Sequence, residues 1–334
     1  MIRENRRTVR VTKIEAVTPQ IKQFTLECAE GKRLPAWSAG SHVPVSLTDG
    51  ANVWRNSYSL IGVPGETQRY QIAVRKEDAA KSKGGSVFLH EQVRAGETLE
   101  IGTPRNFFAV ARHARKHVLI AGGIGITPFL ASLAGLKRSG TAYELHYAFR
   151  ERGEGAFWEP LCEEYGARAR FYVSSEGTRL SPSAILARQP LGTHVYVCGP
   201  HSLIAAVSGA AAEAGWPSSH VHFEEFAPPP ISESAPFIVS LPALPLEVKV
   251  GVRETVLEAL ERAGVLVASS CRVGQCGTCE MRVLAGDPDH RDRCLSEGEM
   301  ADGKIIACVS RCRGERLTLA LPGQSFDVAQ NTMR

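Results

Sequence analysis

Four cysteines near the C-terminus constrain the fold of this chain more than any other feature. Four residues separate Cys271 from Cys276, two separate Cys276 from Cys279, and a further 28 residues lead to Cys308. The spacing C-x4-C-x2-C…C is typical of a plant-type [2Fe-2S] site, in which one tight loop supplies three thiolates and a distant segment supplies the fourth. The sequence therefore predicts an iron-sulfur domain in the last quarter of the chain, with these four cysteines as its metal ligands.

Two glycines, Gly274 and Gly277, lie between the first three cysteines. Without a Cβ atom, their backbone can pass close to inorganic sulfur and direct N–H groups at it. Such hydrogen bonds help to set the reduction potential of a cluster. We expect the fourth ligand, Cys308, on a strand over residues 305–310.

A zinc site with four cysteines is the alternative interpretation. Zinc sites usually pair two C-x2-C knuckles, and Cys308 has a close neighbour only in Cys312, at a different spacing. Cys294 and Cys312 lie near enough in the sequence to compete as the fourth ligand. Ordinary free thiols are the simpler interpretation of both.

The whole chain has 334 residues, which predicts two to three domains. Its nine cysteines are an odd number, which favours metal ligation in a reducing compartment over a disulfide framework. The net charge is only +4 and the basic residues are dispersed, so nucleic acid is not an expected partner. No apolar run has the length of a signal peptide or a membrane span. We expect a cytoplasmic protein with no membrane partner.

Short apolar segments and turn signals alternate over the first hundred residues. This spacing is typical of an antiparallel barrel. The expected strands are residues 8–17, 21–27, 42–47, 57–61, 70–74 and 98–101.

The pattern changes after residue 116. An apolar run, a glycine-rich turn and a helical stretch follow one another, and strand-like and helix-like segments then alternate. This order predicts an α/β domain with a largely parallel sheet. The expected strands are residues 117–121, 143–149, 170–173 and 194–198, and the first helix is residues 128–137.

Three consecutive prolines follow Ala227 and predict a stiff linker. Beyond it we expect a hairpin of residues 237–241 and 246–250 and a helix of residues 255–263. The predicted domains are a barrel domain (1–108), an α/β domain (109–228), a linker (229–236) and an iron-sulfur domain (237–334).

A glycine-rich turn links the first strand of the α/β domain to its helix. Gly122, Gly123 and Gly125 let the backbone approach a pyrophosphate, and the helix that opens at Thr127 favours anionic charge. Taken alone, a glycine-rich segment between a strand and a helix is also compatible with a purely structural turn. The second segment, Cys198-Gly199-Pro200, ends a later strand, and ligands of parallel sheets lie at the carboxyl ends of the strands. Both segments are therefore expected to face one crevice.

A polar stretch on a predicted barrel strand is a candidate flavin site. A tyrosine ring can pack on an isoalloxazine, a hydroxyl can reach its N5 edge, and an arginine can pair with phosphate. The residues are Arg55, Ser57, Tyr58, Ser59 and Leu60. Gly84, Gly85 and Ser86, at an expected helix start, would cradle the phosphate. Taken alone, each segment is more readily explained as an ordinary strand or turn than as a flavin site.

In sequence order, these segments resemble the phthalate dioxygenase reductase family, and the resemblance covers essentially the whole chain. It is carried by residues 55–60, 84–86, 122–128, 198–200 and 223–226 and by the four cysteines. The resemblance implies a flavin-binding barrel with FMN, a domain that binds NADH, and a plant-type ferredoxin domain of the β-grasp fold. It also implies a Rieske-type oxygenase as the partner.

Residue roles are implied by the same resemblance. Tyr58 and Ser59 would hold the flavin ring, and Gly85 and Ser86 its phosphate. Thr127 and Cys198 would flank the nicotinamide, and Phe226 would lie near the flavin face. Family members often have an arginine two residues before the tyrosine. Here that position is Asn56, and the neighbouring Arg55 would face the other side of the strand.

A flavin is needed between the other two redox groups. NADH gives up two electrons at once as hydride, whereas an iron-sulfur cluster accepts one, and a flavin can accept two and release them singly. Plant-type clusters have potentials near about −400 mV and Rieske centres about −150 mV or above, so electrons would run downhill to a Rieske centre. No side chain need act as an acid or base in the hydride step, because the protein supplies orientation and electrostatics.

Cofactor choice is predicted from two loops. Glu151 and Glu154 would repel a 2′-phosphate, although Arg150 and Arg152 could attract one, and on balance we expect NADH. FMN is expected rather than FAD, because no adenine platform is evident and the segment around Ser86 can satisfy a terminal phosphate.

Two other functions stay open. The chain could be a self-contained flavoenzyme that reduces a small molecule directly, or an iron-sulfur sensor that binds nucleotide without turnover. If an oxygenase is the partner, its substrate is also open: carnitine, another trimethylammonium compound or an aromatic acid.

Overall fold

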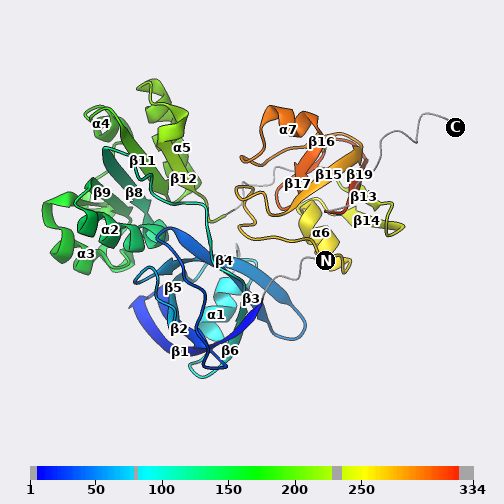
Figure 1. Cartoon of the computed structure of the whole chain (residues 1–334), viewed down its shortest axis with the longest axis horizontal. Helices are drawn as coiled ribbons and strands as arrows, with labels where there is room; N and C mark the ends of the chain where they lie inside the picture. Colours follow the sequence, from blue (N-terminus) through cyan, green and yellow to red (C-terminus); the bar gives the residue numbers. More distant parts are fainter. Residues whose placement is uncertain (1–5, 79–81, 228–234, 323–334) are drawn as a thin grey trace. The chain divides into compact units, whose positions relative to one another are not determined.

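The computed structural model describes residues 6–78, 82–227 and 235–322. The chain divides into two compact units, with the boundary between Phe226 and Ala227 (Figure 1). Most of the predicted linker, residues 229–236, lies outside the described residues. No described helix has both the length and the apolar character that crossing a membrane requires.

A closed antiparallel barrel forms the first part of the N-terminal unit, as predicted. Its sheet runs β4-β5-β2-β1-β6-β3, and pairing of β3 with β4 closes it. Alternate side chains fill its core, such as Val9 and Val11 on β1. The strands are β1 (Arg7–Thr18), β2 (Ile21–Cys28), β3 (Ser41–Thr48), β4 (Val53–Ile61), β5 (Arg69–Arg75) and β6 (Thr98–Ile101). A two-residue strand, β7 (Arg105–Asn106), pairs with β3, and α1 (Gly85–Glu91) lies between β5 and β6.

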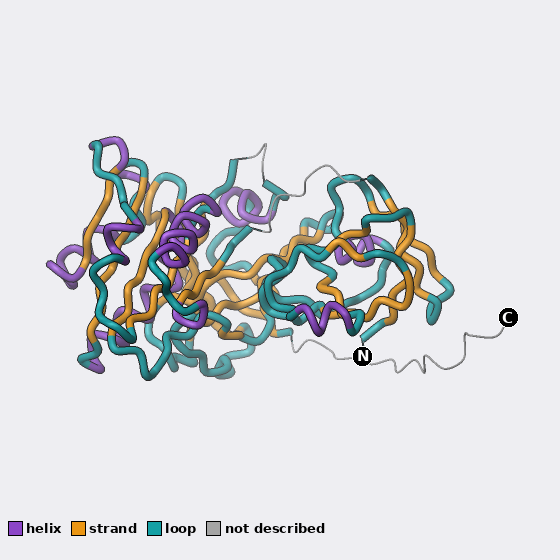
Figure 2. Tube along the Cα trace, turned by 90° about the horizontal axis from the view of Figure 1, so that it is seen from above, coloured by secondary structure: helices purple, strands orange, loops and turns teal. Residues whose placement is uncertain are grey.

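The second part of this unit is a parallel sheet of order β10-β9-β8-β11-β12, again as predicted. Its strands are β8 (Lys116–Gly122), β9 (Ala142–Phe149), β10 (Ala169–Val173), β11 (Thr193–Cys198) and β12 (Val221–Glu224). The core on one face includes α2 (Thr127–Ser139), α3 (Trp158–Tyr165) and the barrel residues Ile21 and Ile61. The other face is covered by α4 (Pro182–Leu186) and α5 (His201–Glu213). Figure 2 shows these helices, in purple, on both sides of the strands.

The C-terminal unit is a mixed sheet of order β14-β13-β19-β15-β17, covered by one helix, α6 (Val256–Arg262). The strands are β13 (Phe237–Leu241), β14 (Leu246–Val250), β15 (Glu280–Ala285), β17 (Lys304–Ile306) and β19 (Arg316–Ala320). A capping box of Thr255 and Glu258 starts α6. A second capping box, of Ser296 and Glu299, starts the short helix α7 (Glu297–Ala301), and a two-strand ladder joins β16 (Pro288–Asp289) to β18 (Arg311–Cys312).

The expectation that Cys308 lies on a strand over residues 305–310 is wrong. Strand β17 ends at Ile306, and Cys308 lies in the turn that follows. The amide of Ser310 donates to the carbonyl of Ile306 at 3.1 Å, and that of Ala307 to the carbonyl of Cys279 at 3.1 Å. A continued strand would point alternate residues to opposite faces of the sheet, whereas the turn brings Cys308 to the cysteine loop.

Candidate functional site

The two glycine-containing segments of the parallel sheet meet at the carboxyl ends of β8 and β11. In the register of these strands Ala121 is opposite Cys198. A Cβ atom on Gly122 would lie 2.8 Å from Leu203 Cδ2, and one on Gly125 would overlap the carbonyl oxygen of Cys198. At Gly125 the missing Cβ lets backbone pack on backbone, which brings the two glycine segments together at the strand ends, where ligands of parallel sheets lie.

Thr127 and Cys198 flank this junction. Thr127 starts α2 and is buried, and its hydroxyl donates to the carbonyl of Ile124 at 3.0 Å. Cys198 is fully buried, and burial, followed by the charge of Glu224, raises the pKa of its thiol well above the ordinary value. The thiol is therefore neutral at physiological pH, which suits an uncharged contact surface rather than a nucleophile.

Strand β4 divides the predicted flavin residues between its two faces. Asn56 and Tyr58 share one face, where the Asn56 amide donates to the Tyr58 hydroxyl at 3.1 Å. Burial raises the pKa of Tyr58 to about 12. Arg55 and Ser59 belong to the opposite face by the alternation of the strand. The remaining predicted residues are Ser57, on the Arg55 face, and Leu60, which is fully buried in the barrel core.

Ser59 is the clearest sign of a missing ligand. Its side chain is 6% exposed, and its hydroxyl oxygen has no hydrogen-bond partner among the described residues. Such a group is rare in a folded protein, because leaving it unpaired costs about 1 to 3 kcal/mol. A polar edge of a bound cofactor would satisfy it.

The glycine pair before α1 packs directly on β4. Gly84 has a φ of 104°, and a Cβ on it would lie 2.6 Å from Trp54 Nε1. A Cβ on Gly85 would lie 2.6 Å from Asn56 Nδ2. The buried Ser86 hydroxyl accepts from the amide of Glu77 at 3.2 Å, which leaves its own hydrogen available. Asn56, rather than Arg55, therefore borders the predicted phosphate cradle.

Two residues outside the predicted set join the barrel to the parallel sheet. His42 on β3 is opposite Ser59 in the register of the strands, and its Nδ1 lies 3.8 Å from Glu224 Oε1 at the end of β12. Both side chains are buried. Glu224 was noted in the sequence only as part of residues 223–226, and no local pattern indicated its contact with the barrel. His42 belongs to no motif.

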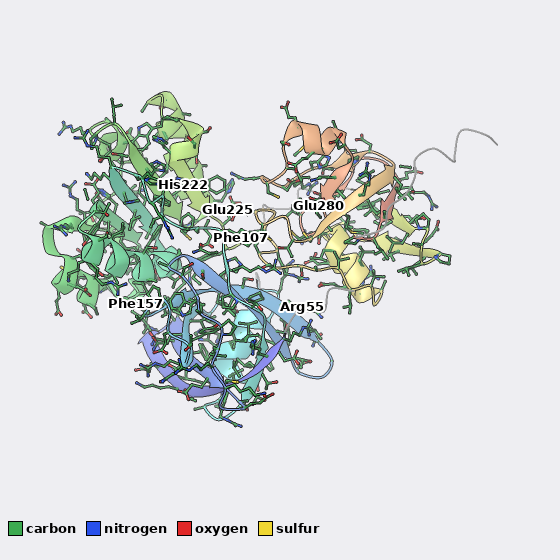
Figure 3. The ribbon with its side chains drawn as sticks, in the orientation of Figure 1. Arg55, Phe107, Phe157, His222, Glu225 and Glu280 are labelled. Carbon is green, nitrogen blue, oxygen red and sulfur yellow. The ribbon has the colours of Figure 1, made fainter. Side chains whose placement is uncertain are left out.

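The predicted Phe226 lies just beyond β12 and is 44% exposed. Its neighbour Glu225 is buried and lies 3.2 Å from His201 Nδ1. Figure 3 shows Glu225 and Phe107 where the barrel and the parallel sheet approach each other. The exposed aromatic ring of Phe226 is therefore free of the core and available to cover a flat ligand.

In the C-terminal unit the four predicted ligands come together. The Cys271 thiol is within hydrogen-bonding reach of Cys276 and Cys308, and Cys279 is within reach of Cys308. Hydrogen bonds from Cys276 and Cys308 lower the pKa of Cys271, whereas the bond to Cys271 raises the pKa of Cys308. The thiols therefore differ in how readily they lose a proton. Metal ions that bind them would displace the remaining protons.

The backbone of the cysteine loop is arranged around the Cys271 sulfur. Amides of Val273 and Gln275 point at the Cys271 sulfur. Gly274 and Gly277 have φ values of 79° and 68°. Among the described residues no three His, Cys, Asp or Glu side chains are already placed as a ready-made metal site, so the four thiols approach one another only through the linked contacts given above. The thiol contacts run from Cys276 through Cys271 and Cys308 to Cys279, so all four sulfurs belong to one continuous site.

The two competing cysteines lie beside this site. Cys294 accepts from the Gly277 amide, and burial and Asp292 raise the pKa of its thiol to about 12. Cys312 is buried on β18, where its thiol lies 3.4 Å from the carbonyl of Arg316. All nine cysteines are among the described residues, and none forms a disulfide.

Known proteins resemble this chain both in parts and as a whole. Residues 243–313 match the 2Fe-2S iron-sulfur cluster binding domain, and residues 103–221 match the N-terminal domain of the dimethylamine monooxygenase subunit DmmA-like family. The carnitine monooxygenase reductase subunit of Escherichia coli (strain K12) is 44% identical over 316 residues, which cover 94% of this chain and 98% of that protein.

Two further proteins extend the comparison. The heme-dependent oxidative N-demethylase beta subunit of Ectopseudomonas mendocina (strain ymp) is 42% identical over 313 residues, 94% of this chain and 98% of that protein. A solved structure of phthalate dioxygenase reductase, described as modular for electron transfer from pyridine nucleotides to [2Fe-2S], is 30% identical with a TM-score of 0.77. The match covers 95% of this chain and 98% of that one.

Proposed function

Because the chain belongs to the phthalate dioxygenase reductase family, we propose that it passes electrons from NADH through FMN and a [2Fe-2S] cluster to an oxygenase. One observation carries the proposal: a single chain holds both four converging thiols and, beside a dinucleotide-type strand edge, a buried hydroxyl that has no hydrogen-bond partner among the described residues. Either feature alone fits several functions. Together they supply the sites for a two-electron donor and a one-electron carrier.

When bound, FMN would supply the chemistry that links a donor of two electrons to a carrier of one. The protein's part is to hold and orient these groups. Ser59 would hold the flavin ring from one face of β4 and Tyr58 from the other, and Gly84, Gly85 and Ser86 would hold its phosphate with Asn56 beside them. Cys271, Cys276, Cys279 and Cys308 would ligate the irons.

At the nicotinamide end, Thr127 and the neutral Cys198 would form an uncharged wall, and Phe226 would cover the flavin face. The buried pair of His42 and Glu224 would fix the barrel against the parallel sheet beside Ser59. Such positioning contributes to the rate because the reacting atoms must be held in near-attack geometry.

A Rieske-type oxygenase is the proposed acceptor, with carnitine or another trimethylammonium compound as its substrate. The support is the carnitine monooxygenase reductase subunit, 44% identical. A second candidate is a heme-dependent oxidative demethylase, because the beta subunit of such an enzyme is 42% identical. We place either system in the cytoplasm, where a reducing environment suits nine unpaired thiols.

The test uses the purified, cofactor-loaded chain. We expect heat to release FMN, and we expect NADH to drive reduction of cytochrome c. Release of FAD would contradict the choice of flavin, and absence of any flavin would favour a sensor. Reduction of a carnitine oxygenase component but not of a heme demethylase alpha subunit would support the Rieske acceptor, and the reverse result would support the second candidate. NADH-driven turnover of a small organic substrate by the chain alone would indicate a self-contained flavoenzyme.

A further inference from the structure

The loops after β9 and β10 lie at the same edge of the parallel sheet as the glycine turn. The strand order places β9 next to β8, and Phe149 is opposite Val173 where β9 and β10 end. In dinucleotide-binding sheets of this order, residues after the second strand meet the adenosine ribose, and its 2′ position distinguishes NADH from NADPH. The residues at that point here are Arg150, Glu151 and Arg152.

Arg152 is held in a two-point ion pair with Glu176. Its Nε and Nη2 donate to the two carboxylate oxygens at 2.6 and 2.8 Å. The guanidinium also lies over the ring of Trp158, 5.1 Å from the centroid. The two side chains are 56% and 43% exposed, so the pair adds little stability, but its two-point geometry is directional: Glu176 orients Arg152 and balances its charge.

The two loops are also joined through their backbones. The amide of Ser175 donates to the carbonyl of Arg150 at 2.9 Å. Glu176 ends the short turn that follows β10, so the loop that would meet the ribose and the loop that carries its counter-charge are fixed to each other. The Arg152 pair is therefore part of the architecture of this sheet edge.

A half-open cavity of about 640 Å³ borders the same arginine. Arg152, Gly153, Phe157 and Trp158 line it on one side, and residues 15–19 of the barrel on the other. This volume is within the range of small-molecule sites. The cavity therefore offers space next to the paired guanidinium, and one of its lining residues, Phe157, is labelled in Figure 3.

We propose that Glu176 is a specificity-determining residue that excludes NADPH by occupying Arg152. A 2′-phosphate brings about two negative charges. At this edge the carboxylates of Glu151 and Glu176 would repel it. The guanidinium of Arg152 could not neutralise it, because it is already paired with Glu176. The ribose 2′-hydroxyl of NADH carries no charge, so the two carboxylates do not repel it. This inference rests on the proposed NADH-oxidising function and names the residue that gives it its nucleotide preference.

Glu176→Gln keeps the size of the side chain and removes its charge, so that Arg152 can pair with a phosphate. We expect the ratio of kcat/KM for NADPH to kcat/KM for NADH, measured with ferricyanide, to rise by about tenfold or more. Calorimetry should show tighter binding of 2′,5′-ADP by this variant, while binding of ADP changes less. This second readout does not depend on flavin content.

Two double variants serve as controls. Arg152→Ala in the Glu176→Gln background should abolish the gain, whereas Arg150→Ala should leave most of it. An unchanged NADPH-to-NADH ratio and unchanged 2′,5′-ADP affinity in Glu176→Gln would overturn the inference, as would a gain that depends on Arg150 instead. If the wild-type chain reduced ferricyanide with NADH while these variants showed no shift, only this inference would fail. If the wild type did not oxidise NADH at all, the proposed function would fail.

Discussion

The hydroxyl of Ser59 is buried on β4, where the described residues offer it no hydrogen-bond partner. If it bonds to the flavin, Ser59→Ala should lower the rate of flavin reduction by NADH several-fold or more, because a hydrogen bond contributes about 1 kcal/mol. Stability of the flavin-free protein should not fall, since no bond within the protein is lost. Stopped-flow absorbance and thermal unfolding measure the two effects.

Ser132→Ala is the matched control for this change. Ser132 is also buried, but its hydroxyl donates within α2 to the carbonyl of Pro128 at 3.3 Å. Flavin reduction should be unaffected in this variant. Normal flavin reduction in Ser59→Ala, or an equal loss in both variants, would count against the assigned role of Ser59.

Gly125 provides a second prediction for a single residue. A Cβ there would overlap the backbone of Cys198, so Gly125→Ala should separate the two glycine segments. We expect a loss of about 2 kcal/mol or more in unfolding free energy, together with weaker NADH binding. Gly135→Ala is the control, since a Cβ on this helical glycine meets nothing within 4 Å and should stabilise by up to about 1 kcal/mol. Equal stability of both variants would mean that the close approach at Gly125 does not matter.

At the scale of secondary-structure elements, a ladder of histidines crosses strands β8, β11 and β12. His194 and His222 lie 2.9 Å apart through their ring nitrogens, and His222 stacks on Tyr196 with ring centroids 4.4 Å apart. Burial, then neighbouring histidines, lower the pKa of His222 and of His117 to about 4. These rings are therefore neutral in the folded state at neutral pH.

This ladder predicts a dependence of stability on pH. The histidines bind protons in the unfolded state below about pH 6.5 but in the folded state only near pH 4, so stability is lost as pH falls between these values. For the buried His117 the loss at pH 5 is about 2 kcal/mol. Thermal unfolding between pH 7.5 and 5 should show the decline, and His222→Gln should make it shallower. If the thermal stability of wild type and variant depended on pH in the same way, the histidines would not be the cause of the decline.

Elements with a clear period could be predicted from the sequence, and short or irregular ones could not. The longer barrel strands carry apolar residues at alternate positions, the four-residue β6 lies between the turn glycines Gly96 and Gly102, and the apolar run before the glycine turn marks β8. Strand β12 has only four residues, too few to establish a period. The alternation of Leu317 and Leu319 in β19 and the capping box of Ser296 were visible signals that the predictions did not use.

In the candidate site, too, local patterns could be predicted from the sequence and contacts between distant segments could not. The cysteine spacing and the glycine turns are local patterns, and their residues come together in the structure. Contacts between distant strands have no local signal. The register that sets His42 opposite Ser59, the approach of Glu224 to His42, and the pairing of Arg152 with Glu176 all depend on which strands become neighbours.

At the scale of the whole molecule, the account requires that flavin and cluster sites lie in separate units. Each unit has its own hydrophobic core, so damage to the cluster should leave the other unit folded. A serine at a cluster position replaces a soft thiolate with a hard oxygen and should weaken or abolish cluster assembly. Cys294 and Cys312 lie outside the ligand spacing, so Cys294→Ser and Cys312→Ser are the matched controls.

Cys279→Ser therefore tests the central claim most directly, through two activities of one sample. The account predicts that NADH still bleaches the flavin and still reduces ferricyanide, while reduction of cytochrome c or of the oxygenase is lost; both control variants should keep both activities. Loss of flavin reduction in Cys279→Ser would show that the units do not act separately. Full reduction of the oxygenase by this variant, with no cluster present in its spectrum, would show that electrons do not pass through the cysteine site.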